Sequence, residues 1–354
     1  MAIFAFSVLS LFLFLYLITA AIDSGGGALY TYALLVKRDE ALAETIMRYL
    51  SPVWETNNVF LIAYIVGLAG YFPQVLPFYG AAMLIPCGIA LAFMLIRGAF
   101  FGYHYLSKEQ NPLTSELAAA ALGISSLMIP LALVPFFALA DTRLFNFTRQ
   151  TGSISLFGLI SSPLLSALGL LALVSIVYLT GLFLLFYTRK SQDAHLLTLF
   201  QHMARWGGLA ALLSSATLGI ALYESTPHLA ERLLRDNWLL MSIAALAFIG
   251  TQMALRWSHQ HWMAGLALLL GITQYAVSFV AYQRMNLPYL VPGVLTIDQA
   301  LTAPVMAQAL TAVLFGGMLL LLPAMFLLYR MFIIAPYKEP SAQSNPEKAV
   351  QRTH

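Results

Sequence analysis

The sequence contains few charged residues. Only 9% of its 354 residues are Asp, Glu, Lys or Arg, whereas 60% are hydrophobic, and a soluble globular domain carries roughly a quarter charged residues. A large buried core does not explain this composition, because a larger soluble domain still needs a charged outer shell. The composition therefore excludes a water-soluble protein and predicts an integral membrane protein.

Cysteine is almost absent. The one cysteine, Cys87, lies inside an apolar run, which excludes an intrachain disulfide framework, a CxxC zinc site and a cysteine-ligated iron–sulfur cluster. We interpret Cys87 as a small packed apolar residue.

Histidines suited to binding haem inside a membrane are also missing. Haem ligation in a helical bundle needs an inward-facing His or Met, but all seven histidines fall in predicted loops, at predicted span ends or in the tail. They are His104, His195, His202, His228, His259, His261 and His354. The sequence therefore predicts that this chain alone binds no haem or other metal.

Motifs of soluble catalysis are absent as well. The chain has no Walker A sequence, no GxSxG elbow and no GxGxxG after a strand, so no complete active site is predicted. The formal net charge of +3 is explained by basic membrane loops, and we expect no nucleic-acid partner.

Long apolar runs dominate what is present. A helix needs about 20 apolar residues to cross the hydrocarbon layer, and nine runs approach that length. We place these transmembrane segments at 3–22, 57–72, 77–97, 117–140, 157–187, 205–223, 237–256, 261–282 and 305–334. The sequence predicts an all-α, polytopic membrane domain over residues 1–336, followed by a polar, disordered cytoplasmic tail over 337–354.

Lys and Arg residues are distributed unequally between alternate loops. One side of the predicted membrane collects thirteen and the other five. Because cytoplasmic loops retain positive charge, this bias predicts an odd number of spans, a periplasmic N-terminus and a cytoplasmic C-terminus.

The loop after the first span carries an amphipathic pattern. Leu42, Ile46 and Leu50 recur every four residues, which favours a short helix on the cytoplasmic surface. Ser51-Pro52 is expected to end that helix, and Thr56, Asn57 or Asn58 to cap the next one.

Three ionisable residues lie at predicted span ends and so are candidates for chemistry, since an isolated charge at the bilayer centre costs about 2.5 to 3.5 kcal/mol. Asp23 ends the first span before Ser24-Gly25-Gly26-Gly27; it either relays protons or is a helix-end Asp in a solvated turn. Glu55 precedes the second span, where the helix dipole favours a carboxylate in a purely structural role too. Arg97 ends the third span and either snorkels to lipid headgroups or pairs with Asp23 or Glu55.

Motifs at both ends of the chain point to a family. Residues 19–27, read as TAAIDSGGG, are similar to the pattern T-D-G-F-D-x-G-x-G. Asp23, Gly25 and Gly27 match it, and Ala20 stands where the first Asp is usual. Residues 52–61 are similar to P-x-W-D-G-N-x-V-W-L.

In that second motif Trp54, Glu55 and Asn57 match, with Glu in place of Asp. Before the last span, Pro288 and Pro292 match a Y-P-x-x-x-P pattern. Taken in this order and at this spacing, the motifs resemble subunit II of bacterial cytochrome bd-type terminal oxidases over roughly residues 1–335.

The resemblance implies a fold of two four-helix bundles plus one additional helix. It also implies a haem-free subunit in the bacterial inner membrane, paired with a subunit I that carries haems b and d and that oxidises a quinol and reduces dioxygen to water. A small accessory membrane subunit and a bound quinone are further expectations.

By analogy with the family, the chain lines a proton path from the cytoplasm, with Asp23, Glu55, Arg97 and His104 as candidates. His104 stands in Phe101-Gly102-Tyr103-His104, where the family has an F-[DE]-Y-R-like stretch, so it either replaces that carboxylate or is simply exposed. Two alternatives stay open: a non-respiratory transporter or scaffold, for which no internal repeat is evident, and a bd-type subunit with another electron donor.

Overall fold

Long helices make up almost the whole protein. The computed structural model describes residues 1–106, 112–148, 151–189, 194–257 and 261–329. Among these residues, eight helices are long and apolar enough to cross a membrane, or nine when residues 57–71 and 73–82, bent by 97° at their junction, count as one span. The predicted all-α, polytopic membrane fold is confirmed.

The helices follow one another with short connections. They are α1 (Ala2–Tyr32), α2 (Glu40–Tyr71), α3 (Leu76–Ala82), α4 (Leu84–Leu106), α5 (Pro112–Leu133), α6 (Leu156–Ser161), α7 (Pro163–Tyr187), α8 (Ala194–Ser225), α9 (Pro227–Asp236), α10 (Trp238–Arg256), α11 (His261–Asn286), α12 (Ile297–Ala300) and α13 (Pro304–Tyr329). A π-helical turn, Ala33–Lys37, extends α1, and 3-10 turns lie at Pro73–Val75 and Val134–Phe137.

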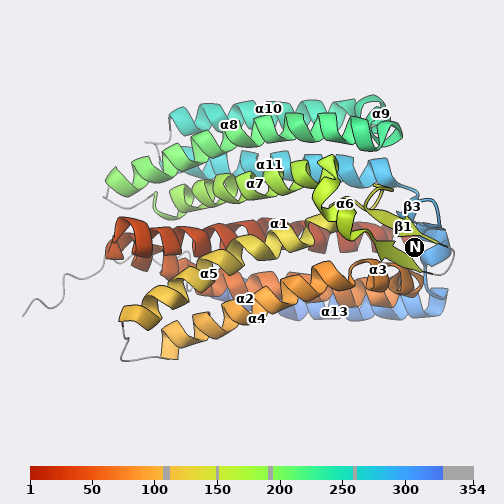
Figure 1. Cartoon of the computed structure of the whole chain (residues 1–354), viewed down its shortest axis with the longest axis horizontal. Helices are drawn as coiled ribbons and strands as arrows, with labels where there is room; N and C mark the ends of the chain where they lie inside the picture. The colour runs from red at the N-terminus through yellow and green to blue at the C-terminus, as the bar shows by residue number, and fades with distance from the viewer. Residues whose placement is uncertain (107–111, 149–150, 190–193, 258–260, 330–354) are drawn as a thin grey trace, which may run out of the picture.

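The long helices form two bundles and one extra helix (Figure 1). Helices α1, α2, α4 and α5 pack as one group, α7, α8, α10 and α11 as the other, and α13 packs against α2. The groups meet where α7 contacts α1 and α5. The expected arrangement of two four-helix bundles plus one helix is therefore observed, and α1 lies where the bundles join.

Small structures cover the end of the molecule where the chain begins (Figure 1). Strands β1 (Phe145–Phe147) and β2 (Gly152–Ile154) form an antiparallel hairpin, as do β3 (Tyr289–Val291) and β4 (Leu295–Thr296). Pro288 and Pro292 flank β3, and the Tyr79 hydroxyl donates to the Leu290 carbonyl. The two motif prolines thus shape a turn at the end of the molecule where α1 begins.

The first helix is longer than its apolar run predicted. It continues without a break through Ser24 and the three glycines that follow it, although glycine is a poor helix former. Close packing explains this continuity, because small residues let helix backbones approach one another inside a membrane. The expectation that Asp23 ends a helix in a solvated turn is wrong.

The second helix also begins earlier than predicted. It starts at Glu40, where the Asp39 side chain accepts a hydrogen bond of 3.0 Å from the Leu42 N–H, and it runs through residues 51–56. Leu42, Ile46 and Leu50 are buried in the main core cluster. The amphipathic pattern was interpreted correctly as helix, but its apolar side faces the protein core and not the membrane surface.

Other boundaries shift by a few residues for local reasons. The fourth span ends its α-helix at Leu133, before Pro135, and the fifth begins at Pro163 after the short α6. There the Ser162 hydroxyl accepts from the Leu165 N–H at 3.1 Å and caps α7. The predicted tail, 337–354, lies outside the described residues.

Candidate functional site: a buried carboxylate–guanidinium pair

Asp23 and Arg97 form an ion pair in the interior of the first bundle. Arg97 Nη2 lies 2.6 Å from Asp23 Oδ1 and 3.2 Å from the Asp23 carbonyl oxygen. Exposure is 4% for Asp23 and 2% for Arg97. Of the two interpretations of Arg97, snorkelling and pairing, the structure shows pairing.

The pair lies deep along α1. At a rise of about 1.5 Å per residue, Asp23 is roughly 30 Å from Ala2 and roughly 20 Å from Lys37, the two ends of the continuous helical segment. Similarly, Arg97 is about 14 Å from the last residue of α4. Both groups are therefore inside the protein and not at a surface turn.

Helix α5 holds the far side of the guanidinium. Arg97 Nη1 donates to Ser126 Oγ at 2.5 Å, and Ser126 Oγ donates to the Leu122 carbonyl at 2.5 Å. Gly27 leaves the space: a Cβ there would lie 2.1 Å from Ser126 Oγ and 3.3 Å from Arg97 Nη1. The matching glycine of the first motif is thus required for a close approach of α1, α4 and α5.

A second glycine brings α1 against the other bundle. A Cβ on Gly25 would lie 2.0 Å from Thr180 Oγ1 on α7, and the Thr180 hydroxyl donates to the Ala21 carbonyl at 3.2 Å. This contact joins the two bundles within about half a helical turn of Asp23. Gly25 therefore allows α1 to pack closely against α7, and Gly27 allows it to pack closely against α4 and α5.

Asn57 on α2 completes the surroundings of the carboxylate. Its side chain hydrogen-bonds Asp23, and its Oδ1 lies 3.2 Å from the Thr19 hydroxyl. Because α2 is continuous here, Asn57 does not cap a helix start as the sequence suggested. Its role is to hold the carboxylate between α1 and α2.

The other sequence-predicted candidates are only partly placed. The backbones of Trp54, Glu55 and His104 lie within α2 and α4, so Glu55 is not near a helix N-terminus. The side chains of these three residues lie outside the described part of the structure. Among the described residues, no cluster of His, Cys, Asp and Glu is arranged to hold a metal ion.

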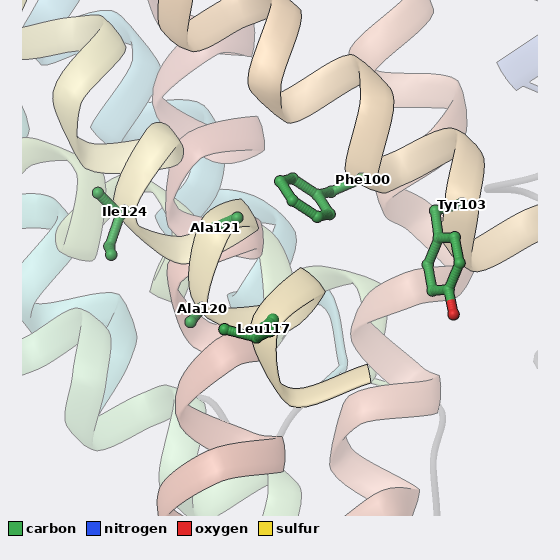
Figure 2. A pocket seen from close by; sticks show the side chains of 6 residues that line it. All are labelled: Phe100, Tyr103, Leu117, Ala120, Ala121 and Ile124. Carbon is green, nitrogen blue, oxygen red and sulfur yellow. The ribbon is translucent and has the colours of Figure 1, made fainter. Parts of the chain in front are cut away.

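An apolar groove is lined by six residues of α4 and α5, and neither Asp23 nor Arg97 is among them (Figure 2). It has a volume of about 450 Å³ between α4 and α5, and its lining consists of Phe100, Tyr103, Leu117, Ala120, Ala121 and Ile124. Ser126 and Arg97 face the protein interior on the same two helices. We therefore assign the candidate chemistry to the polar cluster and not to the groove.

Comparisons with known proteins decide the family. A sequence model described as "Cytochrome bd terminal oxidase subunit II" matches residues 1–332. The chain belongs to the cytochrome bd terminal oxidase subunit II family.

Two relatives match over nearly their full length. The "Putative cytochrome bd menaquinol oxidase subunit II" of Bacillus subtilis (strain 168) is 25% identical over 336 residues, which is 94% of this chain and 95% of that protein. "The structure of bd oxidase from Geobacillus thermodenitrificans" contains a chain that is 31% identical with a TM-score of 0.80, covering 95% of this chain and 99% of that one.

Family membership confirms the resemblance that the motifs suggested. This subunit II is part of a membrane quinol:oxygen oxidoreductase that reduces dioxygen to water, and its partner is subunit I, which carries the haems of the complex. The full-length matches favour this assignment over an unrelated transporter or scaffold.

Sequence reasoning missed Ser126 and Thr19 as members of the polar cluster. A signal existed for the first, because Ser125-Ser126 stands in an otherwise apolar predicted span and polar residues at membrane depth usually face the interior of a bundle. Thr19 also gave a signal, because it matches the first residue of the motif over residues 19–27, but a Thr in a membrane helix commonly bonds its own backbone.

Proposed function

We propose that subunit II carries protons from the cytoplasm toward the oxygen-reducing centre of its partner through Asp23, with Arg97 as the fixed counter-charge. The observation that carries this proposal is the ion pair of 2.6 Å between two almost fully buried side chains. Buried ionisable groups within a membrane are costly to place there, which favours a functional assignment over a packing role.

The chemistry follows from the surroundings of the carboxylate. Reduction of dioxygen to water consumes protons, and a free proton is unfavourable in a region of low dielectric. A carboxylate can accept a proton and release it further along. Asn57 and Arg97 hold its oxygens in one orientation during that exchange.

Glu55 is proposed as a second carboxylate of the path, and His104 as the residue that replaces the family's carboxylate at the cytoplasmic end of α4. The bounds of α4 support the placing of His104 nearer the cytoplasm than Arg97, since the helix continues past Arg97 to Leu106. The cytoplasmic origin of the protons rests on the basic ends of α1, α7 and α10 lying at one end of the molecule (Figure 1).

The same reasoning supports the remaining assignments that we propose. The chain is inserted in the bacterial inner membrane with its N-terminus in the periplasm. The partner subunit carries haems b and d, the electron donor that binds the complex is a quinol, and a bound quinone and a small accessory membrane subunit are further components. The naming of the Bacillus subtilis relative as a menaquinol oxidase subunit supports the quinol.

The test compares three variants in the complete complex with subunit I. Asp23→Asn should slow oxygen consumption by roughly a hundredfold, the usual scale for losing an acid–base group. It also leaves Arg97 buried without its counter-charge, which costs about 3 to 5 kcal/mol. Asp23→Asn/Arg97→Gln removes both charges, so the complex should assemble with its full haem spectrum while turnover stays low.

Asp141→Asn is the matched control. Asp141 is equally buried, but among the described residues its carboxylate is hydrogen-bonded only to neutral groups, the Ser162 hydroxyl and the Arg143 N–H. The turnover of the Asp141→Asn complex should equal that of the wild type. A double variant at Asp23 and Arg97 that recovers normal turnover would show that the pair is structural and would reject the proposal.

A further inference from the structure

Two exposed Arg–Trp pairs stand on the outer face of the second bundle. Helices α8 and α10 form the layer farthest from the first bundle (Figure 1). Arg205 and Trp206 are exposed on α8, and Arg256 and Trp257 are exposed on α10. The tryptophan rings are 68% and 61% exposed, which is unusual for so large an apolar side chain unless a membrane surrounds it.

The two pairs are neighbours in space. Gln201 Nε2 on α8 donates to the Leu255 carbonyl on α10 at 2.6 Å, which sets Arg256 beside the turn of α8 that starts at Gln201. Arg205 lies about one helical turn farther along α8, a rise of roughly 5.4 Å. The guanidinium groups of Arg205 and Arg256 can therefore converge on one small anion.

Carboxylates are scarce on the helices that carry these arginines. Helices α8, α10 and α11 contain a single acidic residue, Glu224, at the opposite end of α8. Among the described residues, neither Arg205 nor Arg256 forms an ion pair, whereas Arg97 does. The positive charge at this end of the second bundle is thus available to an external partner.

The surface next to the arginines is apolar. Leu209, Leu212 and Leu213 follow on α8, and Ile249 and Met253 lie on the neighbouring face of α10, all exposed. Along α8, the surface changes from Arg205 to Trp206 and then to leucines. On α10, which runs in the opposite direction, Trp257 lies outermost and Arg256 comes next, before the aliphatic side chains. The order on α8 is that of phosphate, glycerol and acyl chain in a lipid leaflet, and on both helices the arginine adjoins the aliphatic surface.

We propose that this face of α8 and α10 binds an anionic phospholipid. Its phosphate lies between Arg205 and Arg256, its glycerol region lies against Trp206, and its acyl chains lie along the aliphatic surface of both helices. Charge complementarity selects an anionic lipid over a zwitterionic one, because a choline headgroup cancels the charge that the arginines attract. The adjoining apolar surface selects a lipid over free phosphate.

The test uses the complex of both subunits in detergent, titrated with phosphatidylglycerol, phosphatidylcholine or glycerol phosphate and followed by native mass spectrometry. Phosphatidylglycerol should bind more tightly than phosphatidylcholine. Arg205→Gln and Arg256→Gln should each weaken the binding of phosphatidylglycerol by about fivefold. The double variant should weaken it by about thirtyfold, as expected for two surface cations. Phosphatidylcholine binding should not change.

Arg235→Gln, an exposed arginine on α9 at the opposite end, is the matched control and should bind phosphatidylglycerol as the wild type does. Equal binding of phosphatidylglycerol by the double variant and the wild type would overturn the proposal. So would competition by glycerol phosphate at the concentration at which the lipid binds, because that result would assign the arginines to a free phosphate.

Discussion

Gly27 and Ser126 determine how closely the Arg97 guanidinium approaches Asp23. The glycine removes a side chain that would overlap Ser126 Oγ, and the serine then accepts from Arg97 Nη1. Hydrogen bonds to charged groups contribute roughly 1.5 to 3 kcal/mol. The orientation of the ion pair therefore depends on one small residue and one hydroxyl on two neighbouring helices.

This arrangement predicts coupling between the two positions. Gly27→Ala should lower the stability of the complex by about 1 to 3 kcal/mol, the usual cost of overpacking, because Ser126 must rotate away from Arg97. Ser126→Ala should cost about 1.5 to 3 kcal/mol through the lost hydrogen bond. Thermal unfolding of the purified complex gives both values.

The double variant is the decisive control. In Gly27→Ala/Ser126→Ala the new methyl group no longer meets Oγ, so the loss should be clearly smaller than the sum of the single losses. Strict additivity would contradict the close approach described for α1 and α5.

At the level of helices, the first half of α2 is buried in the protein core, whereas the sequence pattern predicted a helix on the membrane surface. Ile46 is fully buried, at 0% exposure, in a core formed with α1, α7 and α8. Ile46→Ala should therefore destabilise the complex by about 2 to 5 kcal/mol. Leu213→Ala, on a side chain that is 70% exposed, should change stability little. If chemical denaturation shows an equally small loss of stability for both variants, Ile46 lies at the membrane surface instead.

Most spans could be predicted from apolar length alone. A membrane segment must form its backbone hydrogen bonds within itself, and so it must be helical. The exceptions are informative. Sequence rules end helices at Ser51-Pro52 and weaken them at Gly25 to Gly27, but packing against neighbouring helices outweighs both effects. Local rules cannot show such packing, since the partners, among them Thr180 and Ser126, lie far away in sequence.

The candidate site was predictable to a similar degree. Asp23 and Arg97 could be singled out because charges are rare in membrane helices, and their pairing was one of two interpretations. Which partner Arg97 takes depends on how α1 and α4 pack, which no spacing within one helix reveals. The position of Asp23 in the interior followed only when α1 was seen to continue to Tyr32.

At the scale of the whole molecule, the two ends of the bundles have different character. The end with both hairpins contains the start of α1, and the other contains the ends of α4, α7 and α10 (Figure 1). Because basic residues concentrate at the second end, it should face the cytoplasm. This orientation is a prediction that single cysteines can test.

In a Cys87→Ser background, a membrane-impermeant thiol reagent applied to intact cells should label Ser153→Cys and not Ser344→Cys. Ser153 is exposed in the β1–β2 hairpin, which makes it a better reporter than Ala2, whose side chain is buried. Labelling at residue 344 alone would invert the orientation, and the proposed cytoplasmic proton source would then be wrong.

The central claim is that protons pass through Asp23, and the most direct measurement follows protons and electrons separately. The fully reduced complex is mixed rapidly with oxygen in weakly buffered solution containing a pH dye, while absorbance at the haem bands reports electron transfer. In Asp23→Asn/Arg97→Gln, the first haem oxidation step should keep its wild-type rate, and proton uptake from the bulk should be slower by roughly a hundredfold. Proton uptake at the wild-type rate in that variant would contradict the account.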